Sequence, residues 1–278
     1  MVNIITDSTS DLGLDLSTKY QLTVIPLLVT IGGKVYRDGV DLQQKDLFDL
    51  VKKFGELPKT AAPSMGELSK VFDKPGESIF IGISSKLSAT IQSAQLAADM
   101  LPAGKVRVID SLNLSTGVGL LALRAAELRD QGLTANEIVE RIMESRPKVR
   151  TSFVIETMEY LYKGGRCTAI QAIAGSVLKI HPIIEVHYDG TLGVKSKARG
   201  SLQKGHQMML DDFEANLPKL DRQRVFITHT CNDGEIVKSL VDGVKRIAAP
   251  EEICVTSAGS VISSHCGPRT AGILYFVK

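Results

Sequence analysis

The sequence contains no tryptophan, and its aromatic residues make up only 5% of 278 positions. So few rings leave no platform on which nucleic-acid bases could stack. A strong charge of either sign is also missing, because 33 basic residues nearly balance 31 acidic ones and leave a formal net charge of +2. This balance gives no electrostatic reason to bind nucleic acid or an anionic membrane surface.

Cysteines are few and widely spaced. None of the four forms a Cys-x-x-Cys pair: Cys167, Cys231, Cys254 and Cys266. This pattern is typical of reduced, buried thiols and not of a disulfide framework. Two of the cysteines lie within two positions of a histidine, in His229-Thr230-Cys231 and His265-Cys266, but neither pair has the ligand spacing of a zinc site. We therefore expect no metal and no other cofactor.

Long apolar runs are absent, so no segment reaches the roughly 18 residues that a membrane span needs. The first residues, MVNIITDSTSDL, have neither the basic start nor the apolar core of a signal peptide. We expect a cytoplasmic protein without stable membrane insertion.

Short β-rich runs alternate with helical patterns instead. In residues 1–150, strands are expected at 2–6, 23–31, 79–83 and 106–109, and the second of them turns at Gly32-Gly33 into residues 34–36. Helices are expected, among others, at 42–54, 88–101, 158–163 and 169–179. This alternation predicts an N-terminal α/β domain with a parallel sheet covered by helices on both faces. In residues 151–278, a hairpin turn at Asp189-Gly190 indicates a mixed or antiparallel α+β domain. We place the domain boundary near residues 147–150.

One strand leads directly into a run of hydroxyl side chains. The segment GISSKLSATIQSA carries five of them: Ser84, Ser85, Ser88, Thr90 and Ser93. In open α/β sheets, ligands bind beyond the carboxyl ends of the strands, and the start of the next helix favours a carboxylate or phosphate. Helix capping explains any one of these hydroxyls. Because a cap needs only one, the cluster as a set predicts a ligand site.

Two further segments carry side chains that suit an acidic ligand. Thr60 lies in KTAAPS, just before a helix that opens with a capping box at Ser64. His265 lies in SSHCGP, which we expect to form a tight loop before the last strand. A histidine there donates a hydrogen bond to a carboxylate, although a single loop histidine is more often a solvated surface residue.

The segment KGGR at residues 163–166 lacks the spacing of a nucleotide-binding P-loop. Gly164 follows an apolar helical run, so we expect it to be the C-cap of that helix. Arg166 is then free for a partner contact. Asp7 and Asp110 each end a strand, and we interpret them as cap or interface residues and not as a catalytic pair.

Taken together, these segments resemble the DegV family of bacterial fatty-acid-binding proteins. The matching pieces occur in family order along nearly the whole chain: IITDSTSDL, KTAAPS, ISSKLSATIQSA, VIDSLNLSTGVGLL, LYKGGRC, KARG and SSHCGPRTAGI. The chain departs from the family pattern at three places: Ala61-Ala62 in place of a frequent Ser-Gln, Ala89 in place of a usual glycine, and Arg269 in place of an expected glycine.

The resemblance implies two α/β domains with one long-chain fatty acid buried between them. It also implies that the chain is the lipid-carrying subunit of a fatty-acid kinase, in which a separate kinase uses ATP to phosphorylate the bound carboxylate to an acyl phosphate. By motif position, the implied carboxylate contacts are Thr60, Ser93 and His265, with Ser84, Ser85 and Ser88 as their neighbours. The residues implied to face the kinase are Arg166 and Arg199.

Two other functions stay open from the residues alone. A serine hydrolase acting on an acyl ester would use Ser84 or Ser93 as nucleophile and His265 as base, although no Gly-x-Ser-x-Gly elbow is present. A small phosphate- or nucleotide-binding protein would use the same crevice. We expect a binding protein without turnover of its own, and a monomer because the sequence shows no surplus apolar stripe.

Overall fold

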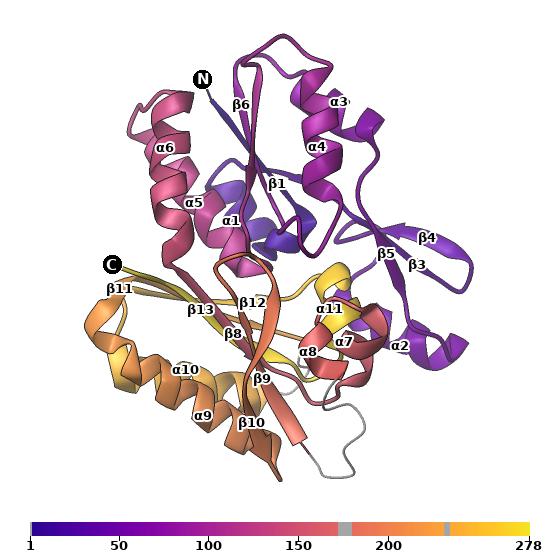
Figure 1. The fold of residues 1–278 in the computed structure, drawn as a ribbon, viewed down its shortest axis with the longest axis vertical. Helices are drawn as coiled ribbons and strands as arrows, with labels where there is room; N and C mark the ends of the chain where they lie inside the picture. Colours follow the sequence, from indigo (N-terminus) through magenta and orange to yellow (C-terminus); the bar gives the residue numbers. More distant parts are fainter. Residues whose placement is uncertain (1, 172–179, 231–233) are drawn as a thin grey trace.

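The computed structural model describes residues 2–171, 180–230 and 234–278. Its first sheet is parallel and has the strand order β2-β1-β6-β7. Strands β1 and β6 of this sheet are labelled in the upper half of Figure 1. The strands are β1 (Asn3–Asp7), β2 (Thr23–Ile25), β6 (Ser78–Gly82) and β7 (Val106–Asp110). The parallel sheet predicted for the N-terminal part is therefore confirmed.

Successive side chains of this sheet enter two different cores, as the two-residue period of a strand requires. Ile4, Ile79 and Ile81 pack with α1, α5 and α6 on one face. Ile5 and Phe80 pack with α3 and α4 on the other face. The helices are α1 (Gly13–Lys19), α3 (Met65–Phe72), α4 (Thr90–Asp99), α5 (Thr116–Asp130) and α6 (Ala135–Ser145). Helices thus cover both faces of the sheet, as predicted.

A second, antiparallel sheet has the order β4-β3-β5. It consists of β3 (Leu28–Ile31), β4 (Lys34–Arg37) and β5 (Lys59–Ala61), and helix α2 (Gln44–Phe54) packs against β3. The prediction of one continuous strand at 23–31 is wrong, because its two halves belong to different sheets. Pro26 lies at the break, and a proline has no N–H to give to a sheet ladder.

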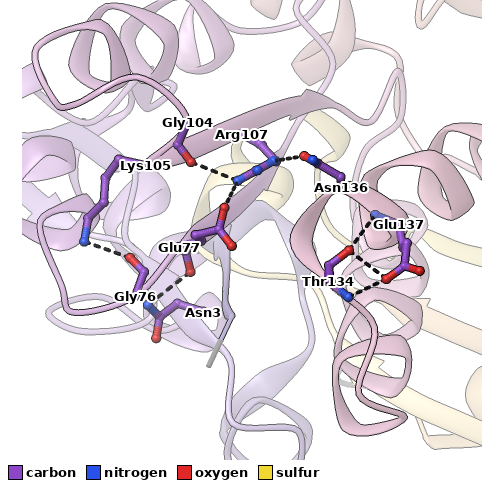
Figure 2. A network of polar contacts seen from close by, with 9 residues as sticks. All are labelled: Asn3, Gly76, Glu77, Gly104, Lys105, Arg107, Thr134, Asn136 and Glu137. Atoms are coloured by element: carbon purple, nitrogen blue, oxygen red, sulfur yellow. Dashed lines mark hydrogen bonds and ion pairs between the residues drawn. The ribbon is translucent and has the colours of Figure 1, made fainter.

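Polar contacts join the amino ends of β6 and β7 to helix α6 (Figure 2). Arg107 lies 2.8 Å from Glu77 in an ion pair, and its Nε donates to the side chain of Asn136. Thr134 and Glu137 form a capping box at the start of α6. This end of the sheet is therefore closed by paired charges and satisfied donors.

The third sheet is mixed and has the order β10-β9-β8-β13-β11-β12. Its strands are β8 (Val149–Val154), β9 (Ile180–Val186), β10 (Leu192–Arg199), β11 (Leu220–His229), β12 (Glu252–Ser257) and β13 (Ala271–Val277). The pair β11–β12 is parallel and the other neighbours are antiparallel. Asp189 and Gly190 turn the chain between β9 and β10, as predicted. Helices α9 (Leu202–Ala215) and α10 (Gly234–Ala248) cover one face.

Helix α5 lies between the two large sheets and packs against β1 and β6 of one and against β8 and β13 of the other (Figure 1). Its residues from Thr116 to Leu123 are all buried, which is the pattern of a core helix that has no solvent face. At Gly119 a Cβ would lie 2.8 Å from the carbonyl oxygen of Ser10. Only glycine allows this close approach.

The remaining described helices are short: η1 (Ser8–Ser10), η2 (Arg146–Lys148), α7 (Glu159–Gly164), α8 (Thr168–Gln171), η3 (Leu217–Lys219) and α11 (Ser260–Cys266). Most of the helix predicted at 169–179 lies outside the described residues. In the described part of the chain, no helix is both long and apolar enough to pass through a bilayer. The division into domains at 1–150 and 151–278 stays a prediction.

Candidate functional site

A cavity of about 310 Å³ lies where the parallel sheet, the small sheet and the mixed sheet meet. Its polar wall residues are Thr60 of β5, Ser88 from the loop after β6, Arg166 from the turn after α7, and His265 of α11. The other wall residues are apolar: Leu27, Ala61, Ala62, Ile83, Leu87, Ala89, Leu114, Leu161, Leu192, Val261, Ile262 and Cys266. A mostly apolar cavity with a few converging polar groups is typical of a small-molecule site.

His265 and Thr60 form the central polar pair of this cavity. The His265 Nε2 and Thr60 Oγ1 atoms lie 2.8 Å apart, although 205 positions separate the two residues in the chain. Burial lowers the pKa of His265 to about 4, and the nearby charge of Arg166 adds to the shift. The imidazole is therefore neutral at pH 7. In this state either the ring N–H donates to the hydroxyl or the hydroxyl donates to the ring nitrogen. When the ring N–H donates, the O–H of Thr60 can donate to a ligand.

The expected tight loop at His265 is wrong, because residues 260–266 form helix α11. The hydroxyl of Ser264 donates back to the carbonyl of Ser260 at 2.6 Å, and that of Ser263 donates to the carbonyl of Ala258. The serine hydroxyls that suggested a loop are therefore bonded to backbone carbonyls at this helix. Gly267, with a φ of 76°, ends the helix. His265 is thus held on the last turn of a helix.

Gly164 allows helix α7 to pack directly against this histidine. A Cβ at Gly164 would lie 2.6 Å from His265 Nδ1. The C-cap of α7 is Gly165, with a left-handed φ of 69°, so the prediction of Gly164 as the cap is wrong by one residue. A left-handed C-cap needs glycine for its backbone, whereas Gly164 is required by the imidazole beside it.

Of the predicted serines, Ser88 lines the cavity, where its hydroxyl bonds that of Thr90 at 2.8 Å. Ser84 is buried and donates to the carbonyl of Gly190 at 2.9 Å, so it ties the end of β6 to the β9–β10 turn. Ser85 is exposed, and its N–H bonds the carboxylate of Asp110. The predicted helix at 88–101 begins only at Thr90.

Ser93 lies on α4, is half-buried, and is not part of the described cavity wall. The roles inferred in carboxylate binding stay predictions for all six residues: Thr60, Ser84, Ser85, Ser88, Ser93 and His265.

The two predicted partner-facing arginines occupy different places. Arg166 is exposed but also borders the cavity, where its Nη1 donates to the carbonyl of Gly164 at 2.6 Å. Its Nε donates across to the carbonyl of Leu87 at 3.4 Å. Arg199 is exposed at the end of β10. Arg166 therefore lies at a rim that is accessible from outside and from the cavity.

Arg269, the third departure from the family pattern, has a left-handed φ of 54°. Glycine adopts this conformation without steric cost, which is why a glycine is expected there. The Arg269 side chain reaches Glu156 at 2.6 Å. The substitution leaves the Thr60–His265 pair in place.

Sequence reasoning missed several wall residues, among them Leu27 and Leu192. Leu27 directly follows Pro26 at the strand break, and Leu192 directly follows the β9–β10 turn. Proline and Asp-Gly signal these turns in the sequence. They do not show that the two leucines meet at the same cavity.

The geometry bears on the rival functions. The hydrogen-bond partner of His265 is a threonine on a strand, and no described serine is bonded to it. A separate polar cavity of about 360 Å³ contains Arg150 and Lys195. Lys195 is paired with Glu185 and Asp212, whereas Arg146 and Arg150 of the same wall donate to backbone carbonyls. Across the described ranges, no group of three or more histidine, cysteine, aspartate or glutamate side chains could hold a metal ion.

Comparison with known proteins gives consistent matches. The family model described as "Uncharacterised protein, DegV family" matches residues 1–278. A DegV domain-containing protein of Caldanaerobacter subterraneus is 33% identical over 100% of this chain and 99% of its own length. A Thermus thermophilus structure, described as fatty acid binding of a DegV family protein, superimposes with a TM-score of 0.92 at 32% identity, covering 100% of this chain and 99% of its own. The Streptococcus pneumoniae Fatty Acid Kinase (Fak) B3 protein loaded with linoleic acid has a TM-score of 0.87 at 24% identity over both full chains, which shows a shared fold.

Proposed function

We propose that this chain, which belongs to the DegV family, binds one long-chain fatty acid in the cavity that contains Thr60 and His265. The observation that carries the proposal is the neutral Thr60–His265 pair set into mostly apolar walls. The description of the Thermus thermophilus structure as fatty acid binding supports it.

The two parts of a fatty acid match the two parts of the cavity. Each methylene transferred from water to apolar walls contributes about 0.8 kcal/mol, so the acyl chain supplies most of the affinity. A carboxylate that leaves water must be hydrogen-bonded. Thr60 and His265 supply uncharged donors for it, and Ser88 lies on the same wall. By motif position we add Ser93, Ser84 and Ser85 to this proposal as less direct contacts.

We further propose that the chain presents this carboxylate to a partner kinase and has no turnover of its own. A carboxylate oxygen would attack the γ-phosphorus of ATP, the bond to the departing ADP would break, and an acyl phosphate would form. Donors without a full positive charge leave electron density on the attacking oxygen. Arg166, at the cavity rim, and Arg199, on the exposed end of β10, are the proposed kinase contacts.

Other parts of the proposal follow from this role. Dependence on ATP places the protein in the cytoplasm. The ligand lies between an N-terminal domain at 1–150 and a C-terminal domain at 151–278. The chain acts as a monomer, and the fatty acid is its ligand without any additional cofactor.

Mass spectrometry of the native ligand tests the proposal. The protein is purified gently, denatured and extracted with organic solvent. We expect one long-chain fatty acid per chain, and we expect added oleate or palmitate to raise the melting temperature of delipidated protein. A released phosphate ester or nucleotide would favour the rival binding function. The absence of both a long-chain acid and a thermal shift would contradict the proposal.

A further inference from the structure

Helix α11, which carries His265, receives its N-terminal hydrogen bonds from distant parts of the chain. The N–H of Gly259 donates to Asp11 Oδ1 at 2.8 Å, and that of Ser260 donates to Asp38 Oδ1 at 2.6 Å. These partners are 248 and 222 positions away. At the other end of the helix, His265 is bonded to Thr60. Side chains from the first 60 residues therefore hold both ends of α11.

Other helices of this chain solve the same problem locally. Ser64, Thr134 and Ser201 each cap their own helix, at α3, α6 and α9. Helix α11 has Gly259 at its N-cap, which has no side chain to offer. A Cβ there would lie 2.9 Å from Asp38 Oδ1, so the remote carboxylates leave no room for a local cap. A local serine would have been enough to cap α11. The remote carboxylates instead link this helix to the N-terminal part of the chain.

The two carboxylates are themselves fixed and costly to bury. Asp11 is 4% exposed and accepts the hydroxyl of Ser115 at 2.6 Å, while Asp38 is 2% exposed. Within the described residues, the groups that donate to them are N–H and O–H groups and not a lysine or arginine. A buried carboxylate without a cation is expensive. Because capping a helix does not need this free-energy cost, we infer that the two carboxylates have a further role.

Asp38 and Thr60 also share one structural unit. Asp38 directly follows β4, and Thr60 lies in β5 of the same three-stranded sheet. Helix α11 packs against β3, β5 and α2. The small sheet therefore hydrogen-bonds the N-terminal end of α11 through Asp38 and hydrogen-bonds His265 of the same helix through Thr60.

We propose that Asp11 and Asp38 are positioning residues for the head-group site, which fix α11 so that His265 Nε2 stays within hydrogen-bond reach of Thr60 and of a ligand carboxyl group. This inference rests on the proposed fatty-acid function for its ligand readout. Neither carboxylate lines the cavity that contains Thr60 and His265, so each would act through the helix.

The test compares two ligands that differ only in the head group, palmitate and hexadecanol, on Asp38→Ala, Asp38→Asn and Asp11→Ala. We expect Asp38→Ala to weaken palmitate binding at least tenfold and hexadecanol binding less than twofold. Asp38→Asn keeps an oxygen that can accept the N–H of Ser260, so we expect it to restore most of the palmitate affinity. The exposed Asp41→Ala is the matched control and should change neither affinity. An equal loss for both ligands, or no loss for either, would overturn the proposal.

A readout without ligand separates this inference from the proposed function. The ¹⁵N resonances of the His265 imidazole in delipidated protein should shift in Asp38→Ala, while those of His206, a buried histidine on α9, should not. Such a shift in a protein that binds no fatty acid would reject the function and keep the positioning role. Palmitate binding by the parent protein, together with unchanged His265 resonances in Asp38→Ala, would keep the function and reject the positioning role. If Asp38→Ala does not fold, Asp11→Ala, which removes one of the two bonds, is measured in both experiments.

Discussion

At the amino ends of β6 and β7, Arg107 is paired with Glu77 and bonded to Asn136 (Figure 2). Beyond the carboxyl end of β1 in the same sheet, Asp11 is buried and accepts N–H and O–H donors, and Asp38 of the small sheet accepts an N–H of the same helix α11. His265, at the other end of α11, is neutral. One end resembles an ordinary protein surface. The other end holds buried carboxyl groups that are bonded to N–H and O–H donors, and an uncharged imidazole.

The two ends of the sheet differ in what their charged groups cost the stability of the fold. Exposed ion pairs add little to stability but cost little to form. Burial raises the pKa of Asp38 to about 6 and that of Asp11 well above its usual value, so both carboxylates oppose folding at neutral pH. Sites of this kind are typical of function. This difference supports the proposal that the ligand site lies at the carboxyl ends of the sheet.

The largest effect is expected from His265→Ala, which removes the central donor of the cavity. A hydrogen bond to a charged group contributes about 1.5–3 kcal/mol, so palmitate affinity should fall roughly 10- to 100-fold. Isothermal titration calorimetry on delipidated protein measures this change. An affinity within twofold of the parent protein would show that the carboxylate is bound elsewhere.

Asp38→Asn is expected to change the pH dependence of stability. The raised pKa of about 6 means that the folded state prefers the protonated acid, so this contribution is present below about pH 4 and is lost as pH rises through 6. Asparagine does not ionise, so the stability of the Asp38→Asn variant does not fall in this way as the pH rises. Between pH 4 and pH 7, its unfolding free energy relative to the parent protein should therefore rise by roughly 2–3 kcal/mol.

Urea unfolding at several pH values tests this prediction for Asp38. Asp41→Asn is the control, since Arg37 lowers the pKa of Asp41 to about 2 and leaves it ionised throughout this range. A constant difference between Asp38→Asn and the parent protein would contradict the account.

Gly164→Ala should destabilise the protein by about 1–3 kcal/mol, because its methyl group would overlap His265 Nδ1. Gly66→Ala on α3 is the matched control. Nothing lies within 4 Å of a Cβ there, so the same substitution should be neutral or stabilising, by up to about 1 kcal/mol. Chemical denaturation measures both variants, and equal effects would show that the packing around His265 is not tight.

The smallest effect is expected at the amino ends of the sheet. Arg107→Ala breaks an ion pair whose glutamate side chain is 50% exposed, so it should cost no more than about 1 kcal/mol. Palmitate affinity should be unchanged. A loss of affinity would mean that the two ends of the sheet are coupled, and the contrast drawn above would fail.

Much of the fold could be predicted from local patterns. The alternation of strands and helices indicated a parallel sheet covered on both faces, and Asp189-Gly190 indicated the hairpin of the mixed sheet. Local patterns failed where a tertiary contact decided the outcome. The 23–31 run divides at Pro26 between two sheets, and residues 260–266 form a helix whose N-terminal donors are met by Asp11 and Asp38.

The candidate site was only partly predictable for the same reason. Family motifs pointed to Thr60 and His265, which the fold brings to 2.8 Å of each other, and to Ser88 and Arg166, which line the same cavity. The contact of Asp38 with α11 could not be predicted, because nothing within the sequence around it signals a helix N-terminus more than 200 positions away.

The most direct test of the central claim is ¹³C NMR of palmitate labelled at its carboxyl carbon and bound to the protein. The carboxyl resonance should differ from that of free palmitate and should move in both Thr60→Ala and His265→Ala, while Arg107→Ala leaves it in place. A carboxyl resonance that is identical in the parent protein and in both cavity variants would contradict the claim that this neutral pair holds the acid.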